Sequence, residues 1–100
     1  MTDLREARDA VVSLLTDKED GIASLHVEIG DLRGDINEAR VLAYENAIVN
    51  GENVSTARHM ADHSSMHWQK ELHRLEGQLA GQQAKLEAAM IRYDYLKQTG

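Results

Sequence analysis

Two series of apolar residues at alternating three- and four-residue spacing occupy the two halves of this chain, separated by the segment Asn50-Gly51-Glu52-Asn53. An apolar position every 3.5 residues predicts helices that pack lengthwise on other helices, because this repeat keeps one stripe of each helix facing its neighbour. The sequence therefore predicts an all-α fold. The residues expected to form the packing interface are Leu15, Ile22, Leu25, Ile29, Leu32, Ile36, Trp68, Leu72, Leu75, Leu79, Leu86, Tyr93 and Leu96.

The segment between the two series predicts a turn at residues 50–53. Gly51 suits the left-handed backbone conformation that follows a helix end, and Asn53 or Ser55 suits the cap of a following helix. We therefore expect one helical domain over residues 1–100, built as a long antiparallel helical hairpin, that is, a two-helix coiled coil that self-associates. Its first arm would cover about residues 3–49 and its second about residues 54–98.

Small residues beside the turn favour this hairpin, because they let two helix backbones approach closely. They are Ala39, Ala43 and Ala47 before the turn, and Ala57, Ala61, Ser64 and Ser65 after it.

A continuous parallel coiled-coil rod is the rival interpretation. In the first series Ile22, Ile29 and Ile36 occupy heptad position a while Leu25 and Leu32 occupy position d, a choice that favours parallel two-stranded pairing. An Asn-Gly step inside a solvated helix costs only about 1–2 kcal/mol.

A second break is possible near residue 16. Residues 16–19 have the spacing of a helix-capping box, Thr16 to Glu19. Leu15 and Ile22 nevertheless lie one heptad apart, so the apolar pattern passes through this segment. We expect the first arm to be continuous.

Composition limits the partners. The net charge of −6 lies entirely in residues 1–50, whereas residues 51–100 are neutral and hold four of the five histidines. Without a basic cluster the chain is not expected to bind nucleic acid.

Cysteine is absent, and no apolar run approaches the roughly 20 residues of a membrane span. No signal peptide is recognisable, so we expect a cytoplasmic protein or part of an assembled particle, with no membrane partner.

Two glycine pairs lie within the helical periodicity. Gly30 and Gly34 recur as Gly77 and Gly81, each pair preceded by a Leu-His step, at an offset of 47 residues. The recurrence is consistent with a duplicated helix. The simpler interpretation is that the glycines make room for bulky neighbours or for a third helix.

His59, His63 and His67 follow one another at four-residue intervals, so consecutive pairs share a helix face. Two imidazoles at this spacing can chelate Zn, Cu or Ni. His59 and His67 are about 12 Å apart along a helix axis, so one ion cannot take all three. The alternatives are a solvated or partner-facing surface, or a cluster whose protonation at mildly acid pH strengthens packing on the acidic arm.

No arrangement of residues indicates catalysis, and we expect neither an enzyme nor a cofactor. The leading functional expectation is a non-catalytic structural or assembly protein that acts through coiled-coil packing, such as a virion, scaffold or complex-adapter component. Its partner would be another copy of itself, a larger protein assembly, or both. The histidine series suggests an alternative, a metal- or pH-responsive helical regulator.

A resemblance suggests a further alternative. The length and the central turn resemble the WXG100 family of secreted helical hairpins, which implies a secreted module. The turn here reads Val49-Asn50-Gly51-Glu52, without that family's Trp before the Gly. Tyr93 and Tyr95 are followed four residues on by Lys97 and Thr99 rather than by the acid of the family's export signal.

Overall fold

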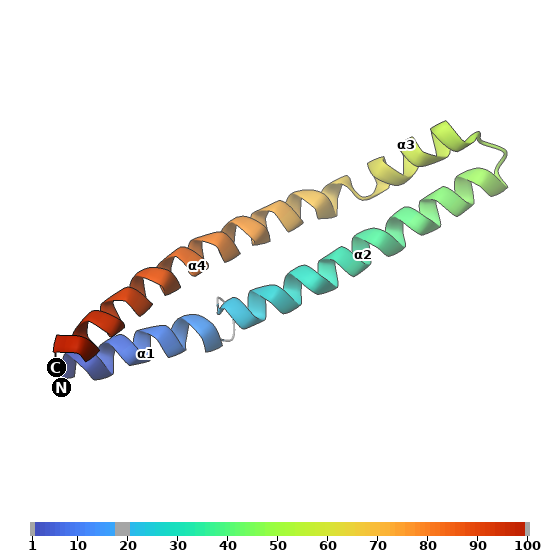
Figure 1. Cartoon of the computed structure of the whole chain (residues 1–100). Helices are drawn as coiled ribbons and strands as arrows, with labels where there is room; N and C mark the ends of the chain where they lie inside the picture. Colours follow the sequence, from blue (N-terminus) through green and yellow to red (C-terminus); the bar gives the residue numbers. More distant parts are fainter. Residues whose placement is uncertain (1, 18–20, 100) are drawn as a thin grey trace. The chain divides into compact units, whose positions relative to one another are not determined.

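The computed structural model describes residues 2–17 and 21–99. They form four helices, labelled in Figure 1: α1 (Thr2–Thr16), α2 (Ile22–Val49), α3 (Val54–Ser64) and α4 (Met66–Thr99). The described residues contain no strand, so the predicted all-α class is confirmed. The helices belong to two compact units, one of residues 1–28 with 76–100 and the other of residues 29–75.

Within residues 29–75, α2 ends in a glycine cap. Gly51 has a φ of +90° and its N–H donates to the Ile48 carbonyl at 3.0 Å. The Glu52 N–H reaches back to the Ala47 carbonyl at 2.9 Å. These two bonds form a Schellman motif, which satisfies carbonyls that the helix end would otherwise leave without partners. The left-handed conformation predicted for Gly51 is confirmed.

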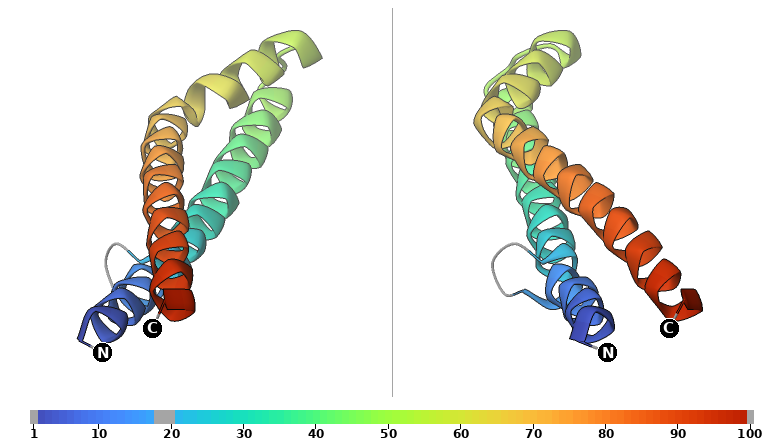
Figure 2. Two further views of the ribbon diagram at one scale, coloured as in Figure 1. Left: turned by 60° about the vertical axis from the view of Figure 1, so that its left-hand side comes forward. Right: turned by 90° about the vertical axis from the view of Figure 1, so that its left-hand side faces the viewer.

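The next helix begins with Asn53 as its cap. Its side-chain Oδ1 accepts a hydrogen bond from the Thr56 N–H at 2.8 Å, and its backbone is extended. Both views in Figure 2 show the chain changing direction between α2 and α3. The turn predicted at residues 50–53 is confirmed. The rival expectation of an uninterrupted helix through this segment is wrong, because the two caps bond the backbone groups that a continuing helix would have used.

The chain after the turn is two helices rather than the one expected. α3 ends at Ser64, and Ser65 separates it from α4. The Ser64 Oγ donates to the Ala61 carbonyl at 2.7 Å, and the Ser65 Oγ donates to the Asp62 carbonyl at 3.2 Å. Hydroxyls that bond carbonyls of the preceding turn compete with the helical hydrogen bonds, and paired serines are a recognised cause of helix breaks.

The first arm is also interrupted. α1 ends at Thr16 and α2 begins at Ile22, so the expected continuity is wrong; residues 18 and 19 of the capping-box segment lie outside the described residues. The Gly21 N–H donates to the Asp17 carbonyl at 3.1 Å, and a Cβ on Gly21 would lie 2.3 Å from that oxygen. Heptad spacing sets which face is apolar, but it does not require the helix to be unbroken.

Each unit has a small core. In residues 29–75 the buried side chains are Ile29, Ile36, Ala47, Ala57, Ala61, Ser65 and Leu75. In the other unit the buried side chains of the described residues are Ala7, Ile22 and Leu25. Of the small residues expected to let the helices approach, Ala47, Ala57, Ala61 and Ser65 are buried, whereas Ala39 and Ala43 are half-buried and Ser64 is exposed.

Candidate functional site

The predicted packing residues fall into three groups by burial. Ile22, Leu25, Ile29, Ile36 and Leu75 are buried. Leu32, Leu72, Leu79, Leu86, Tyr93 and Leu96 are half-buried. Leu15 and Trp68 are exposed, at 39% and 38%. Most of the stripe is thus at least partly covered by the chain itself, and its contact with another chain stays a prediction.

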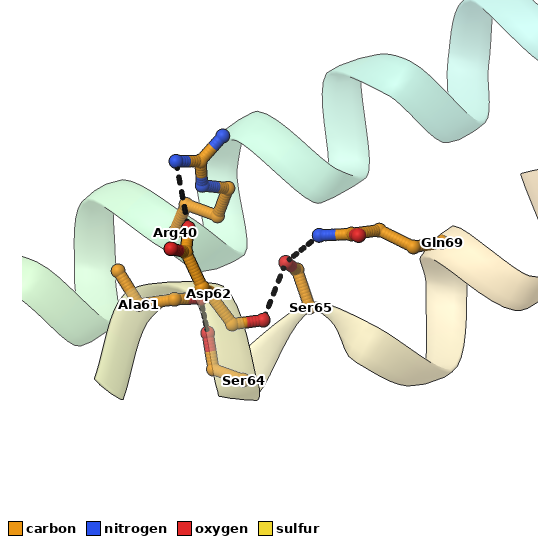
Figure 3. A network of polar contacts seen from close by, with 6 residues as sticks. All are labelled: Arg40, Ala61, Asp62, Ser64, Ser65 and Gln69. Carbon is orange, nitrogen blue, oxygen red and sulfur yellow. Dashed lines mark hydrogen bonds and ion pairs between the residues drawn. The ribbon is translucent and has the colours of Figure 1, made fainter. Parts of the chain in front are cut away.

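An ion pair joins α2 to α3 within residues 29–75. Arg40 Nη2 lies 2.8 Å from Asp62 Oδ1, and both side chains are about half exposed (Figure 3). The contacts continue across the α3–α4 junction. The Ser65 Oγ donates to the Asp62 carbonyl, and it also accepts a hydrogen bond from Gln69 Nε2 at 2.8 Å. These polar contacts connect the three helices on one side of the unit.

The structure separates the three predicted histidines. His59 and His63 line one hollow of about 460 Å³, together with Arg40, Asp62, Met66 and Gln69. His67 instead lies beside Trp68, with ring centroids 6.5 Å apart and an edge-on arrangement.

No three His, Cys, Asp or Glu side chains are placed to hold a metal ion in the part of the chain that the structure describes. Chelation by two imidazoles at a time stays a prediction. His59 and His63 are the pair that shares a hollow.

Glu71 and Arg74 form an exposed pair one turn apart on α4. Arg74 Nε donates to Glu71 Oε2 at 3.0 Å. This hydrogen bond, together with the positive charge of Arg74, lowers the pKa of Glu71 below its ordinary value.

The four glycines in the interiors of α2 and α4 have open space beside them. A Cβ built on Gly30, Gly34, Gly77 or Gly81 would meet no atom of a neighbouring element within 4 Å. The interpretation that they make room for bulky neighbours is therefore wrong for contacts within the described chain. Room for a helix from another molecule stays a prediction.

α2 carries a second stripe that sequence analysis missed. It consists of Val27, Gly30, Gly34, Asn37, Val41, Tyr44 and Ile48, again at alternating three- and four-residue spacing. Its aliphatic members are exposed: Val27 at 63%, Val41 at 54% and Ile48 at 40%. At 3.6 residues per turn the centre of this stripe lies about 130° around the helix from the centre of the buried one. The stronger Ile and Leu series of the same helix hid it, although Val27 and Val41 lie two heptads apart and Val41 and Ile48 lie one heptad apart.

Part of the second stripe lines a groove of about 550 Å³ in the unit of residues 29–75. Asn37, Arg40, Val41, Tyr44 and Glu45 line it from α2. Arg58 and Ala61 line it from α3. The lining therefore combines Val41, Tyr44 and Ala61 with one amide and three charged side chains.

None of the described helices combines the length and apolar character needed to cross a membrane. The chain matches no protein-family model, no curated protein and no solved structure.

Proposed function

We infer that this chain is a non-catalytic structural or assembly protein, folded as an antiparallel helical hairpin. Helices of another polypeptide would cover the apolar faces that the hairpin leaves exposed. The observation that carries the proposal is the second stripe of α2, an exposed series of heptad-spaced apolar and small residues on a helix that already buries its first stripe. A helix needs only one apolar face to pack within its own chain.

Exposed apolar side chains occur in both units. In residues 29–75 they include Val41, Leu42, Ile48, Val49, Val54, Met60 and Met66. In the other unit they include Val12, Val27, Met90, Ile91 and Tyr95. Burying one such side chain fully contributes about 1.5–3 kcal/mol, so covering several of them drives association. Exposed apolar residues that share one helix face, as Val27, Val41 and Ile48 do on the second stripe, are a feature of interaction surfaces.

The glycines support the same function. A glycine in a helix interior costs about 0.5–1 kcal/mol relative to alanine, and none of the four has a neighbouring element of its own chain close enough to require it. A close-packed helix from another molecule would explain the presence of Gly30 and Gly34 on the second stripe.

Sedimentation equilibrium from micromolar to millimolar concentration tests this function. We expect reversible association, with helix content by circular dichroism and thermal stability that rise with protein concentration. A chain that stays monomeric throughout, with a concentration-independent melting temperature, would overturn self-association.

A metal-responsive regulator is the second candidate, and the hollow shared by His59 and His63 favours it. Calorimetric titration with Zn²⁺, Cu²⁺ and Ni²⁺ tests it. We expect one site whose affinity falls on the substitution His63→Ala and is unchanged by His73→Ala, which removes an imidazole outside the cluster. Equal affinities in the three proteins would reject this candidate.

A further inference from the structure

We propose that the second stripe of α2 binds the same stripe of a second copy of this chain, with the two α2 helices parallel and in register. The proposal rests on the assembly function and names its partner and orientation. In its heptad frame, position a holds Val27, Gly34, Val41 and Ile48, and position d holds Gly30, Asn37 and Tyr44.

The residues beside the stripe divide by charge. Every e position on one side is acidic: Asp31, Glu38 and Glu45. The g positions on the other side hold His26, Arg33 and Arg40, followed by Ala47, which is buried. All six charged or ionisable side chains are exposed. One edge of the stripe is therefore negative and the other carries two guanidinium groups and an imidazole.

This division selects the orientation of the partner. In a parallel pair, each g residue faces the e residue five positions later in the other chain. That rule pairs Arg33 with Glu38 and Arg40 with Glu45, each twice because the interface is symmetric. In an antiparallel pair, e faces e and g faces g, which would set acid against acid and base against base. The observed charges thus favour the parallel arrangement and oppose the antiparallel one.

The shape of the surface fits a helix of a second copy. The groove beside α2 holds consecutive heptad positions, from Asn37 at d through Arg40, Val41 and Tyr44 to Glu45 at e. N-terminal to it, the open space at Gly30 and Gly34 permits a close approach of the partner backbone. In register, Asn37 meets its own copy, and a polar residue inside an otherwise apolar seam penalises shifted alignments.

Arg40 has a partner in its own chain, Asp62. This contact is compatible with the dimer because a guanidinium group has five N–H donors arranged in a fork, and the ion pair in the structure involves Nη2 alone. The buried stripe of α2, which contains Ile29 and Ile36, packs within its own chain. The Ile and Leu pattern of that stripe predicted parallel pairing, and we assign the parallel pairing to the second stripe instead.

Charge reversal tests the orientation, with dimer dissociation constants from sedimentation equilibrium of the full chain. Glu38→Arg should weaken the dimer about tenfold, because two attractive contacts with Arg33 become repulsive. Adding Arg33→Glu should restore the natural affinity. Asp35→Arg is the matched control: it makes the same charge change at an exposed b position of α2 and should leave the dimer unchanged.

Cysteine cross-linking provides an independent readout, since the natural chain has no cysteine. Val41→Cys places a thiol at an a position, where it would face its own copy. Asn46→Cys, on the exposed f position of the same helix, is the control. Under mild oxidation we expect a rapid disulfide-linked dimer from Val41→Cys and only slow, concentration-dependent cross-linking from Asn46→Cys.

The outcomes separate this inference from the assembly function. Tightening of the dimer by Glu38→Arg would indicate antiparallel pairing and overturn the orientation. Association that is insensitive to Glu38→Arg and gives no Val41→Cys cross-link would overturn the α2 interface while leaving assembly intact. A natural chain that is monomeric at every concentration would overturn the pairing of two copies through α2, whereas docking of the chain on a different protein would still agree with the assembly function.

Discussion

Arg40 of α2 and Asp62 of α3 form an ion pair of 2.8 Å between helices that the turn at residues 50–53 separates. Both groups are about half exposed, so water and salt weaken their attraction. The pair contributes modest energy, but it records which sides of α2 and α3 lie together.

Replacing Asp62 by Asn should lower the free energy of unfolding by about 0.2–1 kcal/mol, the usual range for an exposed ion pair. Urea denaturation at low ionic strength measures the loss, which should shrink in molar salt because screening removes the attraction. Asp35→Asn neutralises another exposed acid of α2 and is the control. An effect of Asp62→Asn that is equal at both salt concentrations would show that the ion pair is not its source.

Replacing Gly51 by Ala should destabilise the turn. Its φ of +90° places a side chain in a region that L residues rarely adopt, although no atom stands in the way of the added methyl group. The expected cost is about 1–2 kcal/mol, measured as a fall in melting temperature. Gly51→Asn should cost less, since Asn tolerates left-handed backbone better than Ala. The reverse order of stability would contradict this account of the cap.

Alanine at Gly21 and alanine at Gly77 should act in opposite directions. At Gly21 the new Cβ would meet the Asp17 backbone oxygen at 2.3 Å, so the α1–α2 junction must shift and stability should fall by about 1–3 kcal/mol. At Gly77 the Cβ would meet nothing, so removing the helix-interior glycine should raise stability by about 0.5–1 kcal/mol. Thermal unfolding followed at the helix signal compares the two variants, and a stabilised Gly21→Ala would show that the junction is not constrained in this way.

The Glu71–Arg74 pair gives a pH dependence of known sign. Because the pKa of Glu71 is lowered in the folded chain from its ordinary value of 4.5, folding favours the ionised carboxylate. The stabilisation is complete above that ordinary value and is lost as pH falls through the lower folded value. Glu71→Gln should therefore destabilise the chain slightly at neutral pH and not at strongly acid pH. Melting curves across the acid range measure this, and a variant equally destabilised at every pH would rule out the carboxylate charge as the cause.

Much of the fold follows from local chemistry that the sequence displays. The apolar repeat determined the all-α class, because helix formation depends on periodicity over a few turns. Gly51 and Asn53 determined the turn, since each bonds backbone groups within five residues of itself. The breaks at Ser65 and before Ile22 were harder to predict, because the heptad pattern continues through both. At Ser65 the side chain forms a competing hydrogen bond with the Asp62 carbonyl. Before Ile22 the backbone of Gly21 lies close to that of Asp17.

The candidate interaction surface depended on tertiary structure. The sequence by itself determined that α2 would bury the stripe containing Ile29 and Ile36, because these are its largest regularly spaced apolar residues. Only the tertiary structure showed that Val27 and Val41 remain exposed, and that Gly34 has open space beside it. The physical reason is that periodicity specifies which residues share a face, whereas burial depends on which other parts of the chain cover that face.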